Sequence, residues 1–273
     1  MTLPALYDQW AELWPYLQGP EDVAEETAAI EALLVEQLGL PELGRPDGAH
    51  INGADKPTLV EFGAGGGATL AGLARRFDCT AVDLSPAMLE HVAALDLPIH
   101  TVCADMRTAR LGKTFDALLC ADAIDHLSTR EDAQAALQTL AAHLRPGGVA
   151  IVAPTYTDET FVDGDWSAFR RPDDDPAHDA IVRTLSPDLD AGPELTVMSV
   201  AHRLAPDAEA FELTVAIVRR DAPGGVAHLI EDRQRCGLFA ESFWLESLGG
   251  AGFEARAWAQ APGGARWFVG RRC

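Results

Sequence analysis

An acidic residue and three alternating glycines follow a short apolar run in the segment TLVEFGAGGGATLAGLARRF. The acidic residue is Glu61, and the glycines are Gly63, Gly65 and Gly67. Glycine permits a tight turn close to a ligand, and the start of the following helix offers unpaired N–H groups. A dinucleotide site prefers the spacing GxGxxG, and here the acid also precedes the glycines. The segment predicts a turn that binds a small molecule.

Further polar side chains follow later apolar runs. Asp83 ends CTAVD, and Asp105 follows PIHTVCA. Asp122, Asp125 and His126 follow FDALLCA in the segment ADAIDHL. A carboxylate accepts several hydrogen bonds, and histidine can exchange a proton near neutral pH. These residue types suit the binding of hydroxyl or amino groups and the removal of a proton.

The apolar runs that carry these residues alternate with helical patterns up to GVAIVAP. Such alternation predicts a parallel sheet covered by helices on both faces, with ligands beyond the carboxyl ends of its strands. After Pro154, ELTVMSVAHRL and AFELTVAIVRR alternate apolar and polar residues, as half-buried antiparallel strands do. We therefore expect an α/β fold with a doubly wound, mostly parallel, Rossmann-like sheet and an antiparallel β section inserted after the fifth strand.

The expected organisation is a single domain over residues 1–273. Its parts are an N-terminal helical cap, a cofactor-binding core, an inserted antiparallel section on the substrate side, and a segment that completes the core. We assign these parts to residues 1–50, 57–155, 156–236 and 237–273.

Charge and composition restrict the partners. The net charge of −21, from 42 acidic and 21 basic residues, opposes binding to a phosphate backbone, so nucleic acid is not an expected partner. No apolar run is long enough to span a membrane, and the N-terminus shows no export leader. The five cysteines form no metal-ligand cluster. We expect a cytoplasmic protein without a metal.

The order of these motifs resembles class I S-adenosylmethionine-dependent methyltransferases. The resemblance implies S-adenosylmethionine as cofactor and S-adenosylhomocysteine as product, with Asp83 at the ribose hydroxyls and with Asp105 and Met106 at the adenine. It also implies that Tyr7 covers the cofactor, although packing of the N-terminal segment explains Tyr7 equally well. The implied cofactor-binding residues are Tyr7, Glu61, Gly63, Ala64, Gly65, Gly67, Asp83, Leu84, Met88, Asp105, Met106 and Ala121.

The resemblance extends beyond the cofactor motifs. The segments ADMRTARLGKTFDALL, HLRPGGVAIVAPTYTDETFVDGDW and GGARWFVG are similar to bacterial dTDP-amino-sugar N,N-dimethyltransferases. This similarity implies a bacterial enzyme whose small-molecule acceptor is an amine, whose inserted sheet lies on the substrate side, and which forms a homodimer.

Methyl transfer is an in-line displacement, so alignment of the reactants can supply much of the rate. An amine must still lose a proton, and His126 is our candidate base, although it can also be a polar residue at a helix start. Asp122 and Asp125 are expected to orient the ring or the substrate. Tyr156 and Glu159, in TYTDETF, are expected either to bind the acceptor or to cap the chain.

Three functions remain open at this point. The first is an N-methyltransferase acting on an amino-sugar-like amine. The second is an O- or C-methyltransferase of another secondary metabolite on the same scaffold. The third is a protein that binds the cofactor without transferring its methyl group.

Overall fold

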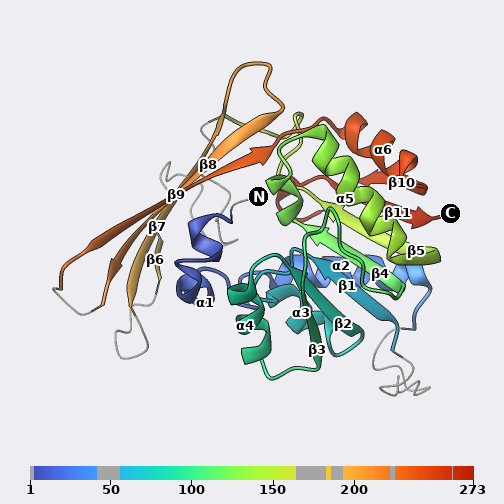
Figure 1. Cartoon of the computed structure of the whole chain (residues 1–273), viewed down its shortest axis with the longest axis horizontal. Coiled ribbons are helices and arrows are strands. Elements are labelled where there is room, and N and C mark those ends of the chain that lie inside the picture. Colours follow the sequence, from blue (N-terminus) through green and yellow to red (C-terminus); the bar gives the residue numbers. More distant parts are fainter. Residues whose placement is uncertain (1–2, 42–55, 164–182, 186–192, 222–224, 260) are drawn as a thin grey trace.

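The chain forms two sheets that differ in topology and lie side by side (Figure 1). The computed structural model describes residues 3–41, 56–163, 183–185, 193–221, 225–259 and 261–273, with the backbone alone for 183–185. The larger sheet has seven strands in the order β10-β11-β5-β4-β1-β2-β3, and the smaller has four in the order β6-β7-β8-β9. This arrangement confirms the predicted fold class, with the antiparallel section following the fifth strand.

Five strands of the core sheet run parallel, and β11 and β10 complete it in antiparallel fashion. The strand order reverses direction between β1 and β4, and ligands of such sheets bind in the crevice at this switch point. The strands are β1 Thr58–Phe62, β2 Asp78–Asp83, β3 Ile99–Cys103, β4 Phe115–Ala121, β5 Leu144–Ala153, β10 Phe253–Trp258 and β11 Trp267–Arg272.

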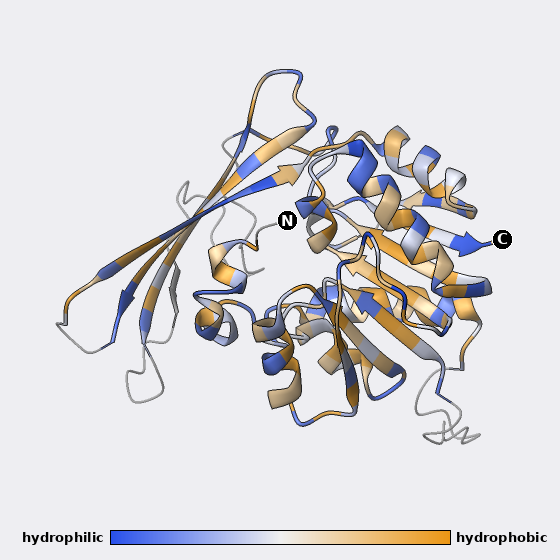
Figure 2. Cartoon of the chain, viewed as in Figure 1, coloured by the Kyte–Doolittle hydropathy of each residue, from blue (hydrophilic) through white to orange (hydrophobic). Residues whose placement is uncertain are grey.

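Helices cover both faces of the core sheet. On one face, α5 and α6 bury a cluster around Phe62, Phe115 and Trp244. On the other, α2, α3 and α4 bury a cluster around Leu33 and Phe77. Because both faces are buried, the strands are mainly hydrophobic, as Figure 2 shows. The helices are α2 Ala24–Leu38, α3 Ala68–Leu73, α4 Pro86–Ala94, α5 Arg130–Ala142 and α6 Glu241–Gly250.

The smaller sheet is antiparallel and packs its inner face against the N-terminal segment. Alternate residues such as Val215 and Ile217 on β8 are buried there, together with Leu6, Leu13 and Leu17 from the start of the chain. The strands are β6 Arg183–Leu185, β7 Glu194–Arg203, β8 Ala210–Arg220 and β9 His228–Gly237. The N-terminal elements are the 3-10 helices η1 Ala5–Tyr7 and η2 Ala11–Leu13, followed by α1 Trp14–Leu17.

Hydrogen bonds fix the N-terminal segment, residues 5–17, to the smaller sheet and to the core. The carboxylate of Asp232, on β9, accepts the backbone N–H groups of Ala5 at 3.1 Å and Leu6 at 3.3 Å. On the core side, the hydroxyl of Ser85 donates to the carbonyl of Tyr7 at 2.5 Å, and His91 Nε2 lies 2.7 Å from the carbonyl of Ala11. The segment is therefore held between the two sheets.

Replacing Asp232 with Ala should loosen this segment, because two backbone N–H groups lose their acceptor. An unsatisfied buried donor costs about 1–3 kcal/mol. We expect a lower Tm and faster hydrogen exchange over residues 5–17. Glu231→Ala is the matched control, because Glu231 is exposed and alternates with Asp232 on β9. Equal protection of residues 5–17 in both variants would contradict this role.

Candidate active site

The glycine turn leads from β1 into α3 and leaves no room for side chains. Gly63 has φ +76°, and a Cβ added to it would lie 2.1 Å from the Cβ of Ala123. A Cβ on Gly66 would lie 2.6 Å from Trp14 Cδ1. The turn is thus packed between the loop after β4 and the N-terminal segment, which explains why the sequence carries glycine there.

Asp83, at the end of β2, holds this turn in place. Its Oδ2 accepts the N–H of Gly65 at 2.8 Å, and its Oδ1 accepts the N–H of Ser85 at 2.8 Å. Burial raises the pKa of Asp83, while the backbone N–H donors act in the opposite direction. Each carboxylate oxygen can still accept a further hydrogen bond, so both are available to a pair of ligand hydroxyls.

Glu61 is buried on β1 with one oxygen unpaired. The strand places Leu59 and Glu61 on the face covered by α2 and α3, whereas Val60 and Phe62 face α5. Glu61 is 4% exposed, and its Oε2 has no hydrogen-bond partner among the described residues. Burial raises its pKa well above the usual value, and the carboxylates of Glu26, Asp83 and Asp122 add to the effect.

Two carboxyl groups follow β4. Asp122 has φ +44°, a strained conformation for a residue with a side chain, and its Oδ1 accepts the hydroxyl of Thr155 at 3.2 Å. Asp125 Oδ2 accepts the N–H of Thr155 at 2.9 Å, while its buried Oδ1 has no partner within the described chain. Burial raises the pKa of both carboxyl groups, well above the usual value for Asp125. Strain and unpaired buried groups of this kind concentrate at functional sites.

His126 packs against the N-terminal segment. Its ring meets the ring of Tyr7 edge-on, with centroids 5.4 Å apart, and Tyr7 also contacts Trp14 at 5.3 Å. The Tyr7 hydroxyl donates to Gln234 Oε1, on β9, at 3.5 Å. Burial lowers the pKa of His126, although Asp232 opposes the shift. The lowered pKa favours the neutral imidazole, which is the form that can accept a proton.

A cavity of about 910 Å³ joins these groups between the core sheet, the N-terminal segment and the smaller sheet. It lies at the carboxyl ends of β1, β2 and β4, as strand order predicts. The predicted residues that line it are Tyr7, Glu61, Gly63, Ala64, Gly65, Asp83, Leu84, Asp105, Met106, Ala121, Asp122, Asp125, His126 and Tyr156.

Three predicted residues lie outside this cavity wall. Gly67 begins α3 and packs against the side chain of Val92. Met88 is buried in α4, where its N–H donates to Ser85 Oγ. Glu159 instead caps α6, because its two carboxylate oxygens accept the N–H of Glu241 at 3.1 and 3.0 Å. The structure thus places Glu159 in the capping position that was its alternative.

Asp105 borders the cavity, but its carboxylate is already paired with the side chain of an arginine. The guanidinium of Arg107 donates to both oxygens, with the shortest contact at 2.6 Å from Nη2 to Oδ2, and it lowers the pKa of Asp105. Arg107 also bonds Asp132, on α5, at 3.0 Å. This pairing fixes the loop after β3 and leaves fewer acceptor positions for a ligand.

Some residues of the cavity wall were not among the site residues predicted from the sequence. Trp14 comes from the N-terminal segment and Glu26 from α2, while Phe211 and Gln234 come from the smaller sheet. A helical pattern assigns the glutamates of α2 to the polar side, but it does not show that this side of the helix borders a cavity. On β9, the alternating burial pattern buries Gln234 and exposes Arg233 and Arg235.

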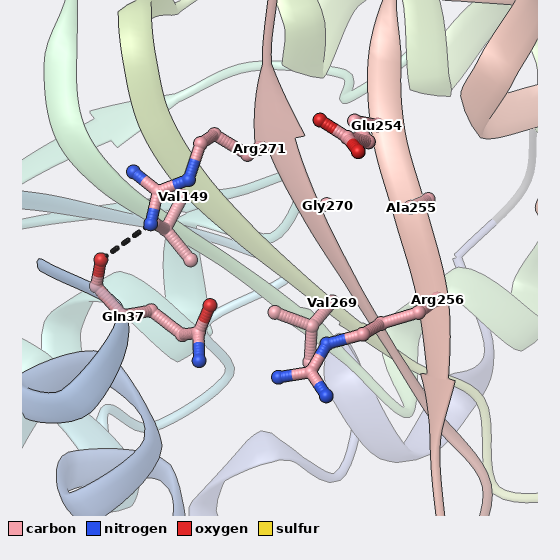
Figure 3. A pocket seen from close by; sticks show the side chains of 8 residues that line it. All are labelled: Gln37, Val149, Glu254, Ala255, Arg256, Val269, Gly270 and Arg271. Carbon is pink, nitrogen blue, oxygen red and sulfur yellow. Dashed lines mark hydrogen bonds between the residues drawn. The ribbon is translucent and has the colours of Figure 1, made fainter.

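Figure 3 shows a second hollow, of about 290 Å³, at the opposite end of the core sheet. It lies beside the amino end of β5, where Arg271 Nη2 donates to the carbonyl of Gln37 at 2.6 Å. None of the predicted site residues borders it, so the larger cavity is the candidate active site.

The larger cavity fits S-adenosylmethionine. The glycine turn permits a close approach of the backbone to a ligand, and the carboxylate of Asp83 and the unpaired Glu61 Oε2 offer acceptors to a nucleoside with a positively charged tail. Within the described ranges, the wall carries several carboxyl groups and no Lys or Arg side chain. We find no group of three potential metal ligands among the described residues.

Comparison with known proteins identifies the family. A model described as "Methyltransferase domain" matches residues 59–148. The chain is also 31% identical over 216 residues to dTDP-3-amino-3,4,6-trideoxy-alpha-D-glucopyranose N,N-dimethyltransferase of Streptomyces venezuelae. The aligned region covers 78% of this chain and 82% of that relative. The chain belongs to the S-adenosylmethionine-dependent sugar N,N-dimethyltransferases. The predicted family, enzyme class and cofactor are confirmed.

Other relatives agree with this assignment of the methyltransferase. This chain is 27% identical to dTDP-3-amino-3,6-dideoxy-alpha-D-glucopyranose N,N-dimethyltransferase of Streptomyces fradiae, over 78% of this chain and 76% of the relative. The crystal structure of Streptomyces venezuelae DesVI shares its fold, with a TM-score of 0.73 and 24% identity over 96% of this chain and 97% of that chain. SAM-bound CalS10, an amino pentose methyltransferase from Micromonospora echinaspora, has a TM-score of 0.71 and 23% identity over 97% and 96% of the two chains.

Asp83→Ala should weaken binding of S-adenosylhomocysteine to the methyltransferase by at least about tenfold, because hydrogen bonds to a charged group contribute about 1.5–3 kcal/mol each. The variant also leaves the N–H groups of Gly65 and Ser85 without their acceptor. Isothermal titration calorimetry measures the affinity. Asp78→Ala, at the other end of β2, is the control. Equal affinity in the wild type and Asp83→Ala would remove Asp83 from the ribose role.

Proposed function

We propose that this methyltransferase transfers the methyl group of S-adenosylmethionine to the amino nitrogen of a deoxyamino sugar. The observation that carries the proposal is the imidazole of His126, which borders the same cavity as the glycine turn and whose pKa is lowered by burial. An amine acceptor must lose a proton, and a neutral histidine can take it. The curated relatives, which are named as methyltransferases of dTDP-amino sugars, support the same acceptor class.

The residues that line the larger cavity define the proposed position of the cofactor. Asp83 would bind the ribose, Met106 would contact the adenine, and Glu61 with the glycine turn would border the amino-acid tail. Tyr7 and Trp14 cover this region from the N-terminal segment. When bound, S-adenosylmethionine supplies a methyl group that is electrophilic because it is attached to a positively charged sulfur.

The proposed acceptor position lies toward the smaller sheet. Tyr156, Phe161 and Phe211 pack together there, with ring centroids 5.3 to 5.5 Å apart, and Tyr156 and Phe211 border the cavity. An apolar wall of this kind suits the carbon-rich face of a deoxy sugar, while a few polar groups set its orientation. Asp122 and Gln234 are the polar groups that we assign to this task.

His126 would remove the proton from the acceptor amine. Its edge-on contact with Tyr7 restrains the ring, and Asp122 and Asp125 stand in the same short segment after β4. The amine then presents its lone pair to the methyl carbon, while the walls of the cavity align the reactants. Asp122 would accept a hydrogen bond from the amine and hold it in line.

A panel of acceptors tests the substrate class. We expect label from methyl-labelled S-adenosylmethionine to appear on the nitrogen of amino deoxy sugars and their dTDP derivatives. Phenols and sugars that carry a hydroxyl at the same position should remain unlabelled. Mass spectrometry of the product locates the methyl group. Labelling of an oxygen or carbon instead would contradict an N-methyltransferase.

His126→Ala should reduce kcat by about 10²–10⁴-fold, the usual contribution of a general base. Because burial lowers the pKa of His126, the wild-type rate should fall as the pH drops through a value below 6.5. The variant should lose this step and still bind S-adenosylhomocysteine. His100→Ala is the control, because His100 is an exposed residue on β3 that does not border the cavity. A wild-type rate independent of pH over this range would exclude the base role.

We also propose that the enzyme is a cytoplasmic bacterial homodimer that acts without nucleic acid or a membrane, and that residues 156–236 form its substrate side. The net charge of −21 supports the absence of nucleic acid. In the part of the chain that the structure describes, no helix is both long and apolar enough to cross a bilayer.

Met198 and Leu229, on the outer side of the smaller sheet, are 38% and 68% exposed and offer an apolar contact to a second copy. Light scattering after gel filtration measures the mass of the assembly.

A further inference from the structure

Glu26 lies in the first turn of α2 and borders the cavity. Its side chain is half-buried, and the described residues give it no hydrogen bond and no ion pair. Glu31, farther along α2, in contrast forms ion pairs with Arg75 and Arg76. A half-buried carboxyl group that faces a cavity without a counter-charge calls for an explanation, because burial disfavours its charged form.

Glu26 stands next to two other carboxyl groups. Glu61 is on the sheet face that α2 covers, and Asp122 follows β4 on the neighbouring strand. The charge of Glu26 raises the pKa of Glu61, and burial together with Asp122 raises the pKa of Glu26 to about 7. The carboxyl groups of Glu26, Glu61 and Asp122 therefore influence one another electrostatically, although they come from three separate elements of the fold. Glu61 Oε2 is the independent sign of a ligand, since it is more than nine-tenths buried, borders the cavity and has no described partner.

Carboxyl groups outnumber the other titratable side chains of the cavity wall, which are those of Tyr7, His126 and Cys236. Asp22 and Glu25 border the cavity from the segment of Glu26 itself, and the charge of Asp83, at the end of β2, raises the pKa of Glu61. No Lys or Arg side chain borders this cavity in the described ranges. A cation is the partner that this arrangement lacks. The amino-acid tail of the proposed cofactor ends in an α-ammonium group, which is a compact cation with three donors.

We propose that Glu26 is a cofactor-binding residue that, together with Glu61, binds the α-ammonium group of S-adenosylmethionine and releases a proton when this group enters. The inference rests on the proposed function, because it needs the cofactor in the larger cavity. The proton leaves the Glu26 carboxyl group for solvent, and the charge of the ammonium group replaces it. No covalent bond forms or breaks.

The sign of the pH dependence follows from this exchange. Below about pH 7, Glu26 holds its proton, so binding must displace it and the affinity is lower. Above that pH, Glu26 is already ionised, and its contribution to affinity is fully present. Affinity for the cofactor should therefore rise with pH through about 7 and then level off, until the ammonium group itself loses its proton.

The test compares two nucleosides that differ in the tail. S-adenosylhomocysteine carries the α-ammonium group, whereas 5′-methylthioadenosine has no amino-acid tail. Glu26→Gln should bind S-adenosylhomocysteine about tenfold more weakly than the wild type, because a charge-assisted hydrogen bond becomes a neutral one. Its affinity for 5′-methylthioadenosine should stay within about twofold of wild type, since this ligand has no group to pair with Glu26. Glu36→Gln removes the same charge from an exposed position on α2 and should change neither affinity.

Proton release provides a second readout. Calorimetric titrations with S-adenosylhomocysteine at pH 7, in phosphate and in Tris buffer, give the number of protons released from the difference in heat. The wild type should release a fraction of a proton, and Glu26→Gln should release less. A circular dichroism spectrum and a Tm equal to those of the wild type would confirm that the variant is folded.

The possible results separate the two proposals. If the wild type binds neither nucleoside, the proposed function itself fails. If the wild type binds both and Glu26→Gln binds S-adenosylhomocysteine equally well, the role of Glu26 is excluded. Equal weakening of both nucleosides also overturns it, because the effect would then not depend on the tail. Unchanged proton release in Glu26→Gln would overturn the exchange of charge.

Discussion

Crowding of carboxyl groups at one edge of the core sheet is the constraint on which the site depends. Parallel strands end at the same edge, so acidic residues that follow β1, β2 and β4 must approach one another. Burial disfavours the charged form of each, and nearby carboxylates add to this penalty at Glu61. The fold offsets part of the cost locally, through backbone N–H groups at Asp83 and through Thr155 at Asp122 and Asp125. The remaining cost is what a cationic ligand relieves.

The sequence was most informative where chemistry follows from strand ends. Glu61, Asp83 and Asp122 could be placed together because alternating strands and helices specify a parallel sheet, whose carboxyl edge is known before any contact is seen. The alternating pattern of ELTVMSVAHRL likewise predicted β7, since one face of an antiparallel strand is buried. Local pattern and strand topology sufficed for these features.

The rest depends on contacts between distant parts of the chain. Glu26 borders the cavity because α2 packs on the core sheet, and no spacing within α2 reveals which of its glutamates faces that cavity. Glu159 caps α6 because Glu241 lies beside it in space, 82 positions away in sequence. The pairing of Asp105 with Arg107 is local, but ADMR alone does not show whether Arg107 turns back onto Asp105 or outward to solvent. Side-chain direction and long-range packing set these limits.

The hydroxyl of Ser85 has a consequence for the timing of ligand exchange. It accepts the N–H of Met88 at the start of α4 and donates to the carbonyl of Tyr7, while the N–H of Ser85 binds Asp83. One residue thus connects the carboxylate assigned to the ribose with the segment that covers it. If a nucleoside binds Asp83 and thereby stabilises this arrangement, it also stabilises the position of the N-terminal segment, and the reverse effect must be equally large. Under the proposed function, displacement of residues 5–17 would open one side of the nucleoside position and so favour exchange of the spent nucleoside.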